Sequence, residues 1–286
     1  MKQRILTALW LIPLALLWMF AFNSPLFAAG SVFLLGLGAW EWGKFVFPSR
    51  PVVYVAPIML LIAVSCFLLN PFASSFPSEV GTSPVSVGFL GMGVAWWFLA
   101  SFLVIKYPSD IALVKSSLLN FIFGITVLLP FFWSLLFLHE MSPAGILPFE
   151  SGSANLFFVM LLVWCADSGA YFTGKAFGKH HMSPAVSPNK TIEGLAGGVL
   201  LALAVAFGAT FMMDHYAPLS LAVAVVMAVS ASVLGDLAES MFKRAAGIKD
   251  SSNLLPGHGG VLDRVDSLTA ALPVYSLIMY LFSRMA

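Results

Sequence analysis

The sequence predicts an all-α polytopic integral membrane protein that crosses the bilayer about nine times, with a cytoplasmic N-terminus and a C-terminus outside. Two observations carry this fold class. The chain of 286 residues is 60% hydrophobic with a mean hydropathy of +0.95, and apolar runs of membrane length recur from one end to the other. Backbone groups in lipid need internal partners, so helices are expected, and the runs lack the apolar–polar alternation of barrel strands.

Nine apolar segments account for this count. The first follows Lys2 and Arg4 and resembles a signal peptide. We interpret it as an uncleaved span, because the next segment is equally apolar and many more follow. Several segments are near the lower length limit for crossing a hydrocarbon core of ~30 Å. The segments are 5–22, 24–41, 52–69, 86–105, 118–138, 154–174, 195–213, 218–238 and 268–284.

The basic residues determine the predicted orientation. When the N-terminus is placed in the cytoplasm and the nine spans alternate, 13 of the 14 Lys and Arg residues fall in cytoplasmic connections and only Arg284 falls outside. This bias follows the positive-inside rule, and one missed or extra span would scatter the charges. We therefore expect a bacterial-type cytoplasmic (inner) membrane with the functional loops on its cytoplasmic face.

The two halves of the chain differ in polar content. Residues 1–150 form an apolar transmembrane scaffold of five predicted spans, and residues 151–286 form a half of four spans with two long charged cytoplasmic loops. Glu41 and Lys44, at the end of the second span, are interpreted as a local ion pair within an interfacial Trp belt. The net charge of +1 gives no indication of a nucleic acid partner.

A first group of functional residues begins in the sixth apolar segment. Small residues recur at every fourth position from 166 to 178, which predicts a close helix–helix contact, either within the chain or in a homodimer. Asp167 and Tyr171 lie on the adjacent edge of this helix. An ionised carboxylate there needs a polar cavity or a cation, and a polar clamp between two helices is the alternative.

The same group continues into the loop that follows. Lys190 lies directly before the next apolar run. Ser187 or Asn189 is expected to cap the helix formed by that run. A capped helix start beside a lysine is a favourable place for a phosphate group, and a plain interfacial cap is the alternative.

A second group lies at the end of the eighth apolar segment. Asp236, Ser240 and Lys243 share one face of the predicted helix, and Glu239 can pair with Lys243 one turn further on. The helix is expected to continue beyond the bilayer and to end near Gly247. Its charged face would therefore point towards the cytoplasmic loops.

The third group is the most charged stretch of the chain. Of 27 charged residues (14 Lys and Arg, 13 Asp and Glu), seven lie between 240 and 267. A turn with Pro256 and three glycines around His258 lets the backbone approach a ligand closely. Asp263 and Asp266 share a face if a helix starts here, although acids at a helix start also suit the dipole alone. Carboxylates beside lysines and arginines fit Mg²⁺ ligands next to phosphate-binding cations.

One long signature joins the last two groups. It runs from Ser240 to Asp266 and reads S-x-F-K-R-x₄-K-D-x₅-P-G-H-G-G-x-L-D-R-x-D, and the shorter stretches W-x-x-D-S-x-A-Y-x-x-G-K and SPNKTIEG precede it. These motifs resemble the phosphatidate cytidylyltransferase (CDP-diacylglycerol synthase) family. The resemblance covers the C-terminal half closely, and the first half agrees in hydropathy and in the piece AWEWGK.

The resemblance implies a nucleotidyltransferase of phospholipid biosynthesis. Its substrates would be CTP and the membrane lipid phosphatidate. Its cofactor would be Mg²⁺, and its products would be CDP-diacylglycerol and pyrophosphate. The expected metal ligands are Asp236 and Asp263, with Asp167, Asp250 and Asp266 in reserve. The residues expected to be catalytic are Ser240, Lys243, Arg244, Lys249, His258 and Arg264. The residues expected to bind substrate are Tyr171, Lys190, Gly259 and Gly260.

Two other functions stay open on the residues alone. A CTP-dependent lipid-alcohol kinase would use similar cations but would accept a hydroxyl lipid and release CDP. An ion-coupled secondary transporter would also carry intramembrane acids and Gly/Pro-broken helices. The charge, however, gathers at one membrane face rather than at the midplane, and no internal repeat is present, which favours the enzyme.

Overall fold

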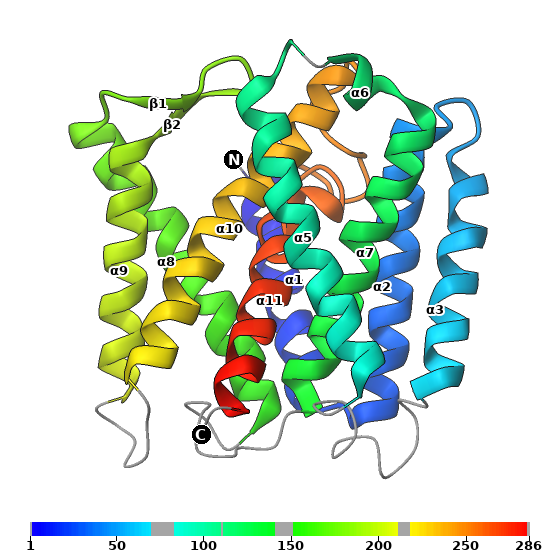
Figure 1. Cartoon of the computed structure of the whole chain (residues 1–286), viewed down its shortest axis with the longest axis horizontal. Coiled ribbons are helices and arrows are strands. Elements are labelled where there is room, and N and C mark those ends of the chain that lie inside the picture. Colours follow the sequence, from blue (N-terminus) through cyan, green and yellow to red (C-terminus); the bar gives the residue numbers. More distant parts are fainter. Residues whose placement is uncertain (1, 70–82, 110, 141–150, 211–217, 285–286) are drawn as a thin grey trace.

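The computed structural model describes residues 2–69, 83–109, 111–140, 151–210 and 218–284. Nearly all of this chain is helical (Figure 1). The helices of the first half are α1 (Lys2–Phe20), α2 (Ser24–Val46), the 3₁₀ turn η1 (Pro51–Tyr54), α3 (Val55–Leu69), α5 (Pro84–Lys106), α6 (Ile111–Lys115) and α7 (Ser117–Glu140). The second half contains α8 (Gly152–Phe177), β1 (His181–Ser183), β2 (Ser187–Thr191), α9 (Ile192–Thr210), α10 (Pro218–Ala245) and α11 (Leu262–Ser283).

Eight helical stretches in the described ranges are long and apolar enough to cross a membrane. They coincide with eight of the nine predicted segments, so the all-α polytopic fold class is confirmed. The ninth predicted segment, 5–22, coincides with α1, whose apolar stretch Leu9–Phe20 is shorter than the other eight. The total of nine spans and the sides on which the termini lie stay predictions.

The helices run between two ends of the molecule (Figure 1). The connections between α2 and η1, between α5 and α7, between α8 and α9, and between α10 and α11 lie at the upper end. We call this the loop end. It carries the basic connections that the sequence places in the cytoplasm, whereas helix α11 ends at the opposite end of the molecule. One end of the molecule therefore gathers the charge, as the alternation of spans requires.

Helices of both halves share one core. An aromatic cluster joins Trp42 of α2, Trp96 of α5, Phe123 of α7 and Phe242 of α10, with ring centroids 4.3 Å apart for Trp96–Phe123 and 5.1 Å for Trp42–Phe242. All four side chains are buried. The two sequence halves are thus packed against each other through the helix that also carries Asp236.

The small residues of α8 make the predicted close contact, and they make it with α9. A Cβ added at Gly198 would lie 2.6 Å from the carbonyl oxygen of Ala166, and one at Gly194 would lie 2.9 Å from that of Ala170. Only glycine leaves room for such an approach of two backbones. This contact lies within the chain, and homodimer formation stays a prediction.

The loop between α8 and α9 contains a structure that the sequence did not predict. Strands β1 and β2 form a short antiparallel hairpin. Ser187 and Asn189 lie in β2, so the prediction that one of them caps the next helix is wrong. The cap is Thr191, whose Oγ1 accepts a hydrogen bond from the amide of Gly194 at 3.1 Å. The hairpin brings Lys190 back over the helices.

Helix α10 ends where the sequence predicts. Its last turn closes with Gly247 at φ +71°, and the amide of Ile248 donates to the carbonyl of Lys243 at 2.9 Å. Glycine tolerates this left-handed conformation, which side chains disfavour. The chain then runs through an irregular loop and enters α11 at Leu262, well inside the bundle (Figure 1).

Candidate active site

A cavity of about 410 Å³ lies between α8, α10, α11 and the loop that joins the last two helices. Three apolar residues form part of its wall, namely Val163, Trp164 and Leu268. The rest is polar. The polar lining residues are Asp167, Asp236, Lys243, Asp250, Asp263, Arg264, Asp266 and Ser267. All five aspartates predicted as metal ligands therefore surround one cavity.

The packing of α10 against α11 brings the carboxylates together. A Cβ at Gly235 would lie 2.5 Å from the carbonyl oxygen of Asp266 and 3.0 Å from Ala270. Glycine at this position thus permits the backbones to approach closely. Asp236, the next residue on α10, then faces the same cavity as Asp266.

Asp263 is the most extensively hydrogen-bonded of the five aspartates. Its Oδ1 accepts from Nζ of Lys243 at 2.6 Å. Its Oδ2 accepts from the amide and the hydroxyl of Ser251, at 2.8 and 2.9 Å, and from the amide of Gly260 at 2.7 Å. Asp263 is buried, with 9% of the residue exposed. A buried carboxylate is stable only with such partners, so the surrounding loop has a defined conformation.

Lys243 pairs with two carboxylates of the site and lines the cavity with a third. Besides its contact with Asp263, its Nζ lies 3.4 Å from Oε1 of Glu239, the ion pair that the helical spacing predicts. Both side chains are buried. Asp266 lies near the same pair. It lines the cavity together with Lys243, and it lines a second, much smaller void together with Glu239.

Lys190 brings the second loop to the cavity. Its Nζ pairs with Oδ2 of Asp236 at 2.5 Å, and the Oδ1 of Asp236 accepts from Ser240 at 3.3 Å. Residues 46 positions apart in the chain therefore meet at α10. The two charged loops of the second half therefore meet at one carboxylate of the cavity.

The comparison with known proteins assigns the family. The sequence profile described as "Cytidylyltransferase family" matches residues 2–282. This protein belongs to the cytidylyltransferase family. The family member from Haemophilus influenzae named phosphatidate cytidylyltransferase is 38% identical over 297 aligned positions, which cover 98% of this chain and 99% of the relative.

Two further relatives carry the same name. The protein from Pseudomonas aeruginosa is 40% identical over 285 positions, covering 98% of this chain and 97% of its own length. The one from Bacillus subtilis is 32% identical over 290 positions, covering 99% of both chains. The resemblance found in the motifs therefore extends over nearly the whole cytidylyltransferase chain.

The structure separates the predicted cations into two sets. Arg264 and Lys243 line the cavity and Lys190 pairs with one of its carboxylates. Arg244 and Lys249 are exposed and lie outside the cavity lining. Tyr171 also lies outside it, 62% exposed, with Nζ of Lys175 5.8 Å from its ring centroid.

The glycine-rich turn acts on Asp263. Gly259 has φ +82°, and a Cβ there would lie 2.6 Å from Oδ2 of Asp263. Gly260 donates to the same oxygen. His258, which lies between Gly257 and Gly259 in the sequence, is half-buried and lies outside the cavity lining. The turn therefore shapes the site by holding a carboxylate.

Sequence reasoning missed the role of Glu41. Both Glu41 and Trp42 are buried, at 0% and 3% exposure, so the interpretation as an interfacial Trp belt is wrong for these two residues. Lys44 instead donates to the carbonyl of Ser251, and within the described ranges no ion pair links it to Glu41. Lys44, three residues further on, offered a local partner for Glu41 in the sequence, and this hid its contact with the distant loop.

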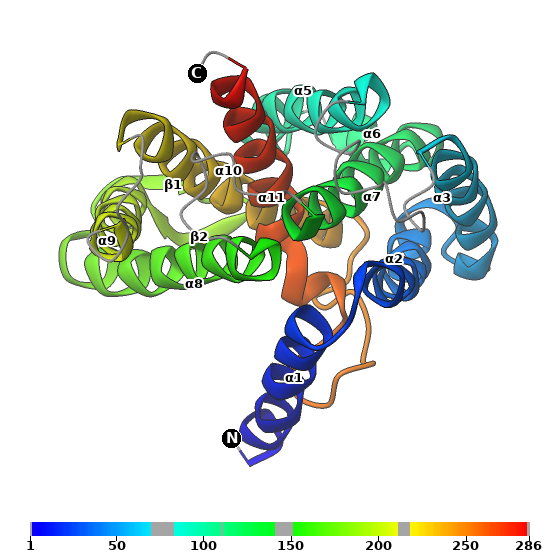
Figure 2. The same cartoon turned by 90° about the horizontal axis from the view of Figure 1, so that it is seen from below.

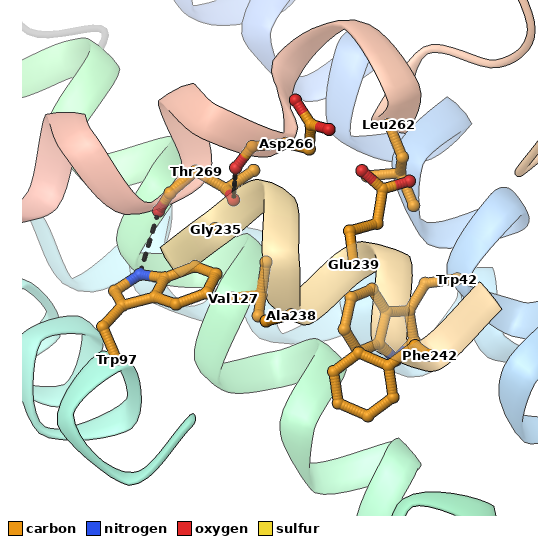
Figure 3. A pocket seen from close by; sticks show the side chains of 10 residues that line it. All are labelled: Trp42, Trp97, Val127, Gly235, Ala238, Glu239, Phe242, Leu262, Asp266 and Thr269. Atoms are coloured by element: carbon orange, nitrogen blue, oxygen red, sulfur yellow. Dashed lines mark hydrogen bonds between the residues drawn. The ribbon is translucent and has the colours of Figure 1, made fainter. Parts of the chain in front are cut away.

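A much smaller void of about 10 Å³ shares the lining residue Asp266 with the cavity (Figure 3). Its size is roughly that of one water molecule. Figure 3 shows mostly apolar and aromatic side chains around it, with Trp97 donating to the carbonyl of Thr269 at 3.2 Å. This contact holds α11 against α5, so the void belongs to the packing that supports the site.

The donor set of the cavity fits Mg²⁺ held jointly with a polyphosphate. Among the residues that the structure describes, no three His, Cys, Asp or Glu side chains form a ready-made metal cluster. Mg²⁺ is usually bound by one or two carboxylates plus substrate phosphates, so such a cluster is not required. Asp263 already has four protein donors, whereas within the described ranges Asp236 accepts only from Lys190 and Ser240 and is therefore better able to bind a metal ion. The identity of the ligands stays a prediction.

Proposed function

We propose that this protein transfers the cytidylyl group of CTP to phosphatidate, giving CDP-diacylglycerol and pyrophosphate for phospholipid biosynthesis. The observation that carries this proposal is the cavity between α8, α10 and α11, in which five aspartates stand beside Lys243 and Arg264. Its position in a member of the cytidylyltransferase family supports the same assignment. Carboxylates for a metal ion and cations for phosphates are the groups that such a transfer requires.

The substrates differ in how they reach the site. Phosphatidate is a lipid with a phosphate headgroup, and the apolar wall of Val163, Trp164 and Leu268 suits the region where its headgroup and glycerol meet. CTP is soluble and would enter from the loop end. We propose that the loop end faces the cytoplasm of a bacterial-type cell, with the helices in the inner membrane, because the basic connections gather there.

The reaction is an in-line displacement at the α-phosphorus of CTP. A phosphate oxygen of phosphatidate attacks, a new P–O bond forms, and the bond to the β-phosphate breaks as pyrophosphate leaves with the electron pair. A phosphate monoester is already ionised near neutral pH, so no strong general base is needed. Catalysis then consists of positioning and charge stabilisation, as in other phosphoryl transfers.

The residues of the cavity divide these tasks. Arg264 is an exposed residue that lines the cavity, and the fork of its guanidinium suits a phosphate. Lys243 and Lys190, held by Asp263 and Asp236, are placed to neutralise charge on the triphosphate or the headgroup. Mg²⁺, bound by aspartates of the set predicted as ligands, would stabilise the leaving pyrophosphate.

Release of pyrophosphate by the purified protein tests the proposal. We expect release only with CTP, Mg²⁺ and phosphatidate together, and loss of release when EDTA is added or when ATP replaces CTP. Diacylglycerol in place of phosphatidate should give no pyrophosphate. Release of CDP with diacylglycerol would instead indicate a lipid kinase, and transport without any nucleotide turnover would indicate a transporter.

A further inference from the structure

Glu41 accepts hydrogen bonds from both ends of the loop between α10 and α11. Its Oε1 accepts from the hydroxyl of Ser252 at 2.5 Å and from the amide of Val261 at 2.9 Å. Its Oε2 accepts from the hydroxyl of Ser251 at 3.1 Å and from the amide of Leu262 at 2.6 Å. Each carboxylate oxygen thus joins one serine at the start of the loop to one backbone amide at its end.

This carboxylate also supplies the cap that α11 lacks in its own sequence. Val261 occupies the N-cap position, and its apolar side chain cannot accept a hydrogen bond. Glu41, on α2, accepts from Val261 and Leu262 in its place. A negative charge at a helix N-terminus is favourable, and three donors of its own, with the hydroxyl of Ser251 that it shares with Asp263, compensate the burial of the carboxylate.

The same contacts lead directly to Asp263. The hydroxyl of Ser251 lies between the two carboxylates, 3.1 Å from Glu41 and 2.9 Å from Asp263, and they share its single hydrogen. A side chain at Gly260 would collide with Ser251 and Glu41, and the amide of Gly260 donates to Asp263. Moving Glu41 therefore moves three of the four donors that orient Asp263 beside Lys243.

We propose that Glu41 is a positioning residue for the transfer reaction: it closes the loop 251–261 and thereby fixes Asp263 and Lys243 in the cavity. The inference rests on the cytidylyl transfer proposed above. Glu41 does not line the cavity, so its effect passes through the loop. A carboxylate that only stabilised α11 would affect unfolding but would leave the chemistry of the folded protein unchanged.

The variant Glu41→Gln tests this role with little change in size. An amide presents an NH₂ group to two donors, whichever way it turns, so the loop must shift. We expect kcat to fall about 100-fold, the effect of a misplacement near 1 Å, while the KM for CTP changes less than about threefold. Hydrogen–deuterium exchange of peptides covering 249–262 should become faster. Wild-type kcat with wild-type exchange would overturn the inference.

A double-mutant cycle with Ser251→Ala tests whether the effect of Glu41 on the site passes through Ser251. If Glu41 acts through Ser251, the serine variant lowers kcat about tenfold alone but less than about twofold when Glu41→Gln is already present. If the double variant instead loses kcat by the product of the two single losses, the two residues act independently, and this result would contradict an effect through Ser251. Should Glu41→Gln not fold, Ser252→Ala removes a single donor. We then expect faster exchange and lower kcat, and wild-type values of both would overturn the inference.

Glu140→Gln is the matched control. Glu140 is also a buried carboxylate at a helix end, 8% exposed and paired with His139 at 2.7 Å, but on the end of α7 opposite the loop end. We expect a lower unfolding temperature with unchanged kcat, and an equal loss of kcat here would contradict a specific role for Glu41. Failure of the wild-type protein to make CDP-diacylglycerol would refute the proposed function, while the exchange data would still show whether Glu41 closes the loop 251–261.

Discussion

Asp263 is the residue on which most interactions of the site converge. Its carboxylate accepts hydrogen bonds from a lysine on α10 and from a hydroxyl and two backbone amides of the loop. Sequence spacing could predict Asp263 and Lys243 as functional, because charged residues between apolar spans are expensive. It could not predict Ser251 or Glu41, because a serine in a polar loop carries no signal and Glu41 lies 222 positions away in the chain.

Asp263→Asn should remove activity while leaving the protein folded. The amide places an NH₂ group against donors of Ser251, Gly260 or Lys243, and it removes the charge that holds Lys243. We expect kcat to fall by about 10²–10³-fold, as for other lost electrostatic contacts in active sites. The check is turnover of the monodisperse purified variant, and near-normal turnover would refute the assignment of Asp263 to the site.

Arg264→Lys should cost more activity than Arg244→Lys. Arg264 lines the cavity, whereas Arg244 is exposed outside it. A point charge does not replace the bidentate fork of a guanidinium, so we expect about a tenfold lower kcat/KM for Arg264→Lys. Steady-state kinetics of both variants side by side provide the measurement. Equal losses, or a larger loss for Arg244→Lys, would show that the cavity is not the phosphate site.

At the scale of elements, helices were predictable and short strands were not. The spacing of Asp236, Ser240 and Lys243 predicted a shared face of α10, and these residues lie along it. The hairpin of β1 and β2 contains Pro, Ser and Asn, which in sequence are typical of a loop. Its pairing depends on the supporting helices, and so does the position at which Lys190 reaches Asp236.

Gly259→Ala and Gly247→Ala separate backbone strain from the geometry of the site. Both glycines have positive φ, +82° and +71°, so alanine at either position is strained by about 1–2 kcal/mol. A Cβ at Gly259 also meets Asp263 at 2.6 Å, whereas one at Gly247 meets nothing within 4 Å. We expect both variants to unfold at lower temperature but only Gly259→Ala to lose turnover. Equal turnover would contradict the role of the turn.

At the scale of the whole molecule, the spans could be predicted but their arrangement could not. Hydropathy locates a helix in the membrane without saying which neighbour it touches. The small residues of α8 predicted a close contact, yet only the structure identifies α9 as the partner. The aromatic cluster that joins Trp42, Trp96 and Phe123 to Phe242 of α10 left no signal in the sequence, because buried aromatic residues resemble lipid-facing ones.

The orientation of the molecule can be tested with cysteines at its two ends. Asn253 in the loop after α10 and Arg284 after α11 are both exposed and lie outside the cavity lining. With Cys66 and Cys165 replaced by serine, we expect Asn253→Cys to react with an impermeant maleimide only in inverted vesicles. Arg284→Cys should react in intact spheroplasts. The reverse pattern would place the loop end outside the cell and contradict the assignment.

The central claim is that the cavity between α8, α10 and α11 transfers a cytidylyl group to a lipid phosphate. Following the label from CTP carrying ³²P at either the α- or the γ-position tests it most directly, with purified protein, Mg²⁺ and phosphatidate. We predict that the α-label appears in the lipid product and that the γ-label appears in pyrophosphate. Transfer of the γ-label to lipid, or no transfer of the α-label, would contradict the account.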